Sequence, residues 1–278
     1  MRKIFELTLS QPQTAVEALA EHTGLSKGRI KDAMAKGACW WTFKGKQLRL
    51  RRATKALRPG TRLILNYDDG VLALKPTPGQ CVQDYGRYSV WYKPHGLLAQ
   101  GSQWGDHCSL LRWVEQHTKR DCFLVHRLDA DAAGLMVIAH DPKAAAALSR
   151  LFQGRAIRKV YQAWVTGSLE AENRCLNVDI DGKPAVSHVT TLHWDTDHTL
   201  VSVTIETGRK HQIRRHLAGI GHAIVGDRLY GRPASQPLQL VAVGLAFQCP
   251  ITQQAIDVVL PEEWQLLAGA AADVDVQR

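Results

Sequence analysis

Strand-forming segments that follow one another without a helix between them most constrain the fold of this chain. Apolar and β-branched runs occur at 160–166, 187–193, 200–205 and 238–247. The link between 187–193 and 200–205 is long enough for an antiparallel turn but too short for the crossover helix of a parallel pair. We therefore expect an α+β fold with a mainly antiparallel mixed sheet, rather than a doubly wound one.

The remaining periodic segments divide the chain into a small and a large part. Further strands are expected at 88–92, 122–125 and 135–139, and helices at 109–117, 142–153, 210–220 and 261–267. We expect a small α/β module at 1–68, a Pro- and Gly-rich linker at 69–87, a larger domain at 88–268 and a flexible tail at 269–278.

The N-terminal segment carries start and stop signals of two helices. Thr14 can cap a helix, with Glu17 in the reciprocal position of a capping box, and Gly24 marks its end. Ser26 can cap a second helix. Strands are expected at 38–43, 47–50 and 62–67. These elements predict a helix pair on a small sheet.

The positive charge of the chain is concentrated in the same segment. Residues 1–60 hold 13 Lys and Arg against 4 Asp and Glu, a surplus of 9, whereas residues 61–278 hold 22 of each. Such asymmetry suggests an anionic partner, most often a nucleic acid, although charge alone fits a solubilising surface equally well. The residues expected to contact this partner are Lys27, Lys31, Arg49, Arg51 and Arg52.

Neither a metal site nor a membrane segment is indicated. The six cysteines lie 14 to 74 residues apart without a Cys-x-x-Cys pair, and no His-Glu-x-x-His pattern occurs. No apolar stretch reaches the roughly 18 residues that span a bilayer, and the start MRKIFE lacks the apolar core of a signal peptide. We expect a cytoplasmic protein with no metal and no membrane contact, and a monomer by default.

A candidate catalytic acid lies in residues 126–134, which read HRLDADAAG between two apolar strand segments. Side chains on such loops often face ligands, so Asp129 could act as a nucleophile or a base. Taken by itself, this residue is better explained as a turn aspartate bound to its own backbone.

Two other segments offer cationic and aromatic groups. Residues 205–216, IETGRKHQIRRH, join a strand to a helix start, where cations oppose the helix dipole and suit phosphate or carboxylate partners better. Tyr161 in RKVYQAW at 158–164 offers a flat surface for a base, although a core tyrosine is commoner. A fourth segment, WYKPHGL at 91–97, ends a strand in a Pro-Gly turn.

Together these four segments resemble the signature of the RluA-type RNA pseudouridine synthases. The sequence HRLD is followed by a short loop and Gly, as in the family. A Lys-Pro-x-Gly turn precedes it, and a Lys-x-Tyr strand and TGRxHQIRxHL at 207–217 follow it, in the family's order. GIGHAIVGDRLYG at 219–231 continues the likeness, which extends over about residues 88–260. Residues 12–68 resemble, more weakly, the S-four-like RNA-binding module that often precedes this catalytic domain.

The resemblance implies an enzyme that isomerises uridine to pseudouridine in structured RNA, ribosomal RNA first and transfer RNA second, without a cofactor. It implies that Asp129 is the essential acid, by a nucleophilic or an elimination route, and that Arg214 pairs with it. A stacked target base must be extruded, and Tyr161 would pack against it. The expected substrate-binding residues are Arg127, beside the flipped nucleotide, with Tyr161, Arg214, His126 and Arg209.

The chain departs from the family where Ala132-Ala133 replace Thr-Ser, Ala223 replaces Pro, and Leu240-Val241-Ala242 replace Leu-His-Ala. These changes remove hydroxyl and imidazole groups and bear on substrate choice. Two other functions remain open. One is a non-catalytic RNA-binding or ribosome-assembly factor, and the other is an N-glycosidic hydrolase that uses Asp129 and Asp131 and releases free base.

Overall fold

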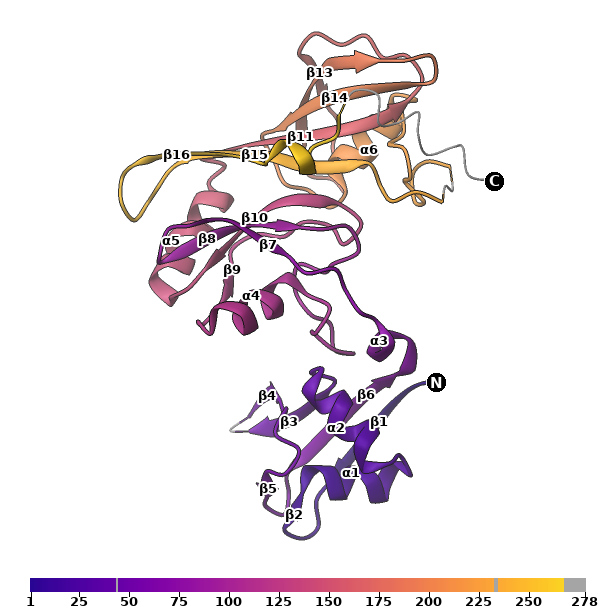
Figure 1. The fold of residues 1–278 in the computed structure, drawn as a ribbon, viewed down its shortest axis with the longest axis vertical. Helices are drawn as coiled ribbons and strands as arrows, with labels where there is room; N and C mark the ends of the chain where they lie inside the picture. The colour runs from indigo at the N-terminus through magenta and orange to yellow at the C-terminus, as the bar shows by residue number, and fades with distance from the viewer. Residues whose placement is uncertain (44, 233–234, 268–278) are drawn as a thin grey trace. The chain divides into compact units, whose positions relative to one another are not determined.

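The computed structural model describes residues 1–43, 45–232 and 235–267, and the chain separates into two compact units (Figure 1). Unit 1 comprises 1–76 and 100–118, and unit 2 comprises 77–99 and the chain from 119 onward. Each unit has an apolar core of its own. The predicted flexible tail at 269–278 lies outside the described residues.

Unit 1 contains a four-stranded antiparallel sheet in the order β1-β6-β3-β4. Its strands are β1 (Arg2–Thr8), β3 (Cys39–Phe43), β4 (Lys46–Arg49) and β6 (Arg62–Asp68), and β2 (Gln13–Thr14) pairs separately with β5 (Ala56–Leu57). Strand β1 was not predicted, because only Phe5 and Leu7 of its seven residues turn toward the core. Its pairing with β6 therefore defines it, rather than its own sequence pattern.

The two predicted helices of unit 1 are confirmed as α1 (Ala15–Thr23) and α2 (Lys27–Ala35). The Thr14 hydroxyl accepts a hydrogen bond from the main-chain NH of Glu17, and Gly24 ends α1 with a φ of 71°. Ser26 caps α2 in the same way. Capping by these side chains satisfies NH groups that have no partner within the helix.

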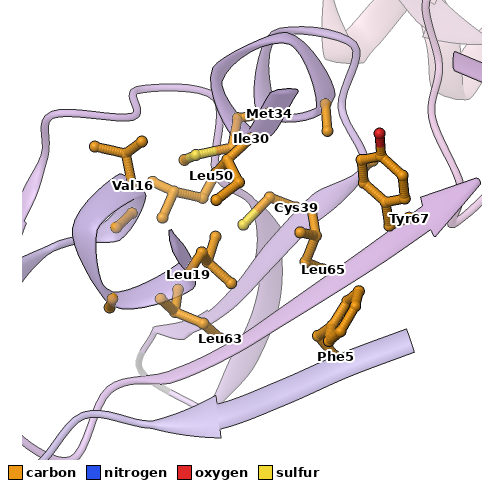
Figure 2. Packing of buried hydrophobic residues seen from close by; sticks show 14 of the residues in the cluster. Phe5, Val16, Leu19, Ile30, Met34, Cys39, Leu50, Leu63, Leu65 and Tyr67 are labelled. Carbon is orange, nitrogen blue, oxygen red and sulfur yellow. The ribbon is translucent and has the colours of Figure 1, made fainter. Parts of the chain in front are cut away.

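The core of unit 1 lies between these helices and one face of the sheet (Figure 2). Val16, Leu19, Ile30 and Met34 of the helices meet Phe5, Leu63 and Leu65 of the strands, all of them buried. Burial of this much apolar surface in a module of this size supplies its main stabilisation.

The segment predicted to be a linker, 69–87, instead forms secondary structure. Helix α3 (Asp69–Ala73) lies near the end of the first segment of unit 1, and strand β7 (Gln80–Asp84) is an edge strand of the sheet in unit 2. The turn-rich composition of the segment reflects short elements rather than a free connection.

Residues 100–118 also differ from the predicted boundaries, because they belong to unit 1 and not to the larger domain. They contain helix α4 (Leu110–Thr118). The main-chain NH of Asp106 donates to the carbonyl of Lys36 at 2.9 Å, and its carboxylate binds Arg51. Composition could not reveal contacts between residues this far apart in the sequence.

Unit 2 is organised by one mixed sheet with the main order β12-β13-β14-β11-β15-β10-β8-β7. Its other strands are β8 (Tyr88–Lys93), β9 (Phe123–Leu124), β10 (Ala133–Ala139), β11 (Ile157–Thr166), β12 (Arg174–Asn177), β13 (Val186–Trp194), β14 (His198–Ile205), β15 (Leu240–Gln248) and β16 (Ala255–Val259). Among the described strands only β10 and β15 pair in parallel. The predicted mainly antiparallel mixed sheet is therefore confirmed.

Helices α5 (Pro142–Gln153) and α6 (Gln212–Gly219) accompany this sheet (Figure 1). The bounds of α5 are those predicted. Helix α6 begins two residues later than predicted, because His211 has a left-handed φ of 54° and cannot continue a right-handed helix. The helix predicted at 261–267 is a single 3₁₀ turn, Glu262–Trp264. Strands β7, β12 and β16 were not predicted.

The junction between β10 and β15 positions the loop that precedes β10. Gly134 has a φ of 118°, and a Cβ atom there would lie 2.3 Å from the main chain of Ala242. Only glycine therefore permits this close approach. The HRLDADAAG segment ends at this point, so its acid is carried on a loop that is fixed at its C-terminal end.

Candidate active site

The loop that carries Asp129 is tied to the turn after β8 by a buried lysine. Lys93 is fully buried, and its Nζ lies within hydrogen-bond distance of four main-chain carbonyls, including those of Ala132 at 2.6 Å and Leu97 at 2.8 Å. Burial lowers the pKa of Lys93 to about 7, against the opposing effect of Asp129 and Asp131. The Lys-Pro segment thus holds the acid loop in place.

The side chain of Asp129, 31% exposed, faces a cavity of about 110 Å³. The loop 127–132, strands β11, β14 and β15, and the start of α6 line this cavity. Five of the six predicted catalytic and substrate-binding residues are among its lining: Arg127, Asp129, Tyr161, Arg209 and Arg214. The structure therefore brings together side chains that lie up to 87 positions apart in the sequence.

Arg214 lies at the centre of an ion-pair network. Its side chain is 2% exposed, and its Nη1 lies 3.6 Å from Oδ2 of Asp129 and 4.0 Å from Oδ2 of Asp131. Its Nε and Nη2 donate to both carboxylate oxygens of Asp227 at 2.8 and 2.7 Å. The guanidinium group is thus fixed by Asp227 and directs its remaining edge at Asp129.

Asp227 is a residue of this network that sequence reasoning did not assign. Its carboxylate also accepts hydrogen bonds from the main-chain NH groups of Leu229 and Tyr230, at 2.9 and 3.1 Å. Burial would raise the pKa of Asp227, but these bonds and those from Arg214 hold it below its ordinary value. The GDRLYG motif contained the signal, because a buried Asp on a turn is a natural partner for a buried Arg.

His211 and Tyr230 form a second contact that was not predicted. The Nδ1 of His211 lies 2.9 Å from the Tyr230 hydroxyl, and its Nε2 lies 3.8 Å from Oδ2 of Asp129. The guanidinium group of Arg214 lies over the Tyr230 ring, 5.4 Å from its centroid. The imidazole is thus placed beside the acid and lines the cavity.

The acid is bordered by three further side chains that come from different parts of unit 2: Tyr161, Arg127 and Arg209. Tyr161 lies on β11, next to a bulge in its pairing with β15, and burial raises the pKa of its hydroxyl. Arg127 is exposed at the rim. Arg209 donates from Nε to the carbonyl of Pro184 at 3.0 Å, which holds it at the cavity edge. A flat ring and two cations therefore border the space in front of the carboxylate.

His126 does not line this cavity, and its predicted substrate-binding role stays a prediction. Its Nε2 accepts a hydrogen bond from the main-chain NH of Val137 at 2.9 Å, and its ring stacks on Phe152 with centroids 4.1 Å apart. Burial, with a smaller effect of Lys159, lowers its pKa to about 3, so the ring stays neutral. The imidazole fastens the loop to β10.

Two of the departures from the family pattern occupy facing positions. Ala133 pairs with Val241 across the parallel junction, and both are buried in the same apolar cluster. An apolar pair thus stands where the resemblance leads us to expect Ser and His. Ala132 lines the cavity at the position where the resemblance leads us to expect a threonine hydroxyl.

The cations predicted to bind RNA in unit 1 fall into two groups. Arg49 lies over the Trp40 ring at 4.2 Å and donates to the carbonyl of Ser102 at 2.6 Å. Arg51 binds Asp106 and the carbonyl of Ala35. These two guanidinium groups hold residues 100–118 onto the sheet, and their predicted contact with RNA stays a prediction. Lys27, Lys31 and Arg52 are exposed.

Within the described ranges, no cluster of three or more His, Cys, Asp or Glu residues could hold a metal ion. No described helix is long and apolar enough to cross a membrane.

Solved structures define the class of fold. Human RNA Pseudouridylate Synthase Domain Containing 1 aligns with 72% of this chain and 96% of its own, at 18% identity and a TM-score of 0.59. Human RNA Pseudouridylate Synthase Domain Containing 4 aligns with 65% and 87%, at 23% identity and a TM-score of 0.52. The chain has the fold of these proteins.

Sequence relatives define the family. The profile of the RNA pseudouridylate synthases matches residues 87–219. The dual-specificity RNA pseudouridine synthase RluA of Pasteurella multocida is 34% identical over 195 residues, which cover 63% of this chain and 89% of that protein. This chain belongs to the RluA-type family of RNA pseudouridine synthases.

The match is partial for other relatives. The ribosomal large subunit pseudouridine synthase D of Nitrosomonas europaea is 33% identical over 193 residues, or 63% of this chain. The chain spans 56% of that protein and 54% of an RNA pseudouridine synthase from Chloroflexus aurantiacus, about half the length of each.

Proposed function

We propose that this protein isomerises uridine to pseudouridine in structured RNA, with Asp129 as the essential catalytic residue. The observation that carries the proposal is the position of the Asp129 carboxylate, between the buried Arg214 guanidinium and a cavity bordered by Tyr161. A carboxylate that only stabilised its turn would need neither a fixed cation nor an open cavity.

The geometry suits the first chemical requirement of the reaction. Both the nucleophilic and the elimination route need an ionised carboxylate of fixed direction at the sugar. The Nη1 of Arg214 lies 3.6 Å from Oδ2 of Asp129 and faces this carboxylate, and the two bonds from Arg214 to Asp227 keep that guanidinium from turning away. The second requirement is a base removed from its stack, for which Tyr161 supplies a ring surface and Arg127 a cation at the rim.

We propose ribosomal RNA as the first substrate class and transfer RNA as the second. The support is the family, in which relatives carry the names ribosomal large subunit pseudouridine synthase D and dual-specificity RNA pseudouridine synthase RluA. Unit 1 would hold the RNA as an S-four-like module. Its exposed cations Lys27, Lys31 and Arg52 are suited to phosphate contacts.

The test is pseudouridine mapping of unmodified transcripts of ribosomal and transfer RNA after incubation with the protein, together with assay of free uracil. Isomerisation predicts pseudouridine at defined positions, unchanged RNA mass and no free uracil. Binding without modification would favour the RNA-binding factor instead, and release of uracil would favour the N-glycosidic hydrolase.

A further inference from the structure

The conformation of His211 is not explained by helix capping. His211 precedes α6 with φ 54° and ψ 31°, a left-handed backbone conformation that is strained for a residue other than glycine, and its side chain makes no capping hydrogen bond. The main-chain NH of Arg209 is satisfied by Oε1 of Gln212 at 3.1 Å. The strained backbone instead directs the imidazole into the cavity, where 15% of the side chain is exposed.

The cavity offers few groups that can take up a proton. Among its described lining residues, the Asp129 carboxylate and the His211 imidazole offer lone pairs of basic groups, whereas a guanidinium offers no acceptor and burial raises the pKa of the Tyr161 hydroxyl. In the proposed reaction Asp129 is engaged with the sugar. A proton must nevertheless leave carbon 5 of the uracil after that carbon has bonded to the sugar.

We propose that His211 is the residue that takes this proton, an inference that rests on the proposed function. The C5–H bond breaks, its electron pair forms the C5=C6 double bond, the pair of the N1=C6 double bond returns to N1, and the proton passes to Nε2 of His211. The imidazolium then releases it to solvent, while N1, freed when the original glycosidic bond broke, takes up a proton from solvent. Atoms and charge balance without a further reactant.

The charges around His211 support a neutral imidazole. Burial lowers its pKa, and the nearby cations Arg214 and Lys210 lower it further, against the opposing effect of Asp129 and Asp227. The Tyr230 hydroxyl can accept the Nδ1 proton, which leaves the lone pair on Nε2 at the cavity. Tyr230 is thereby a positioning residue for His211.

The experiment compares wild type, His211→Asn and Tyr230→Phe in single-turnover reactions on ribosomal and transfer RNA transcripts that contain uridine with hydrogen or deuterium at carbon 5. We expect His211→Asn to be slowed about 100-fold or more, with a deuterium isotope effect that the wild type lacks. Below the His211 pKa, which is lower than its ordinary value of 6.5, the imidazolium cannot take the proton, so the wild type should slow and acquire the isotope effect, whereas the Asn variant should show neither change. Tyr230→Phe should be slowed less.

His222→Asn serves as the matched control, because His222 binds the carbonyl of Thr166 at 2.9 Å and does not line the cavity. Added imidazole should restore part of the activity of His211→Ala. The inference is overturned if His211→Asn keeps the wild-type rate, or is slowed equally for hydrogen and deuterium with no rescue of His211→Ala. Wild type that forms no pseudouridine would overturn the proposed function itself.

Discussion

Cations are used differently in the two units. In unit 2, Arg214 is buried and held within 4.0 Å of three carboxylates, those of Asp129, Asp131 and Asp227. In unit 1, Lys27, Lys31 and Arg52 are exposed on a segment with a surplus of positive charge. A buried charge needs fixed partners, so each one is individually critical, whereas exposed charges act additively and can replace one another.

The sharpest test of this contrast is Asp227→Asn. We expect turnover to fall about 100-fold or more, because Arg214 loses the carboxylate that fixes its direction. We also expect the free energy of unfolding to fall by about 3 kcal/mol, because a buried guanidinium loses its charged partner. Single-turnover kinetics and thermal unfolding measure the two effects. The control is Asp181→Asn, which removes the 69% exposed partner of Arg215 on the same helix. Equal effects of the two substitutions would refute the distinction.

Arg214→Lys keeps the positive charge but removes the two-nitrogen contact with Asp227. We expect a rate loss of about 100-fold with RNA affinity nearly unchanged, because an ammonium cannot bind Asp227 through two nitrogens and face Asp129 with a third. Arg215→Lys is the neighbouring control and should remain close to wild type. Near-normal turnover of Arg214→Lys would mean that charge alone suffices.

Replacing Lys27, Lys31 and Arg52 together by Gln tests the exposed cations. We expect weaker RNA binding and a shallower dependence of log affinity on log salt, by about 2 to 3 units of slope, at an unchanged single-turnover rate with saturating RNA. The control triple is Arg2, Arg29 and Arg62 to Gln, whose ion pairs with Asp68, Asp69 and Glu6 span 2.5 to 3.4 Å, whereas Lys27 has a longer contact of 3.7 Å with Glu17. If the dependence of RNA affinity on salt changes no more than in this control, Lys27, Lys31 and Arg52 do not make the main electrostatic contact with RNA.

The smallest expected effect is that of Thr14→Ala. Loss of the α1 cap should destabilise unit 1 by about 1 kcal/mol, measured by thermal unfolding, and leave the chemical step unchanged. Ser10→Ala, at an exposed position next to β1, should have no such effect. A slower chemical step in Thr14→Ala would indicate that the fold of unit 1 influences the chemistry in unit 2.

Local features were predictable because their signals lie within a few residues. The caps at Thr14 and Ser26 and the bounds of α5 follow from side chains within one helical turn. Strand β1 has only two inward residues and depends on β6 for its definition. The return of residues 100–118 to unit 1 depends on Arg49 and Arg51, which the sequence displays only as two members of a cationic run.

The site was predictable where one motif carried the residue and not where two motifs met. Asp129, Arg214 and Tyr161 were chosen because their segments together resemble one family, and the structure brings them to one cavity. The two hydrogen bonds between Arg214, on α6, and Asp227, in the segment after α6, connect residues of two different motifs. Neither residue is unusual by itself. The hydrogen bond from the main-chain NH of Val137 to His126 is likewise invisible in the sequence.

The central claim is that Asp129 performs the chemistry, and its most direct test is a comparison of Asp129→Asn with Asp131→Asn. The two carboxylates lie on one loop, have similar exposure of 31% and 28%, and both lie within 4.0 Å of Arg214. We predict that Asp129→Asn forms no detectable pseudouridine in RNA that the wild type modifies, with RNA affinity little changed, and that Asp131→Asn remains active. Pseudouridine formation by Asp129→Asn at the wild-type rate would contradict the claim.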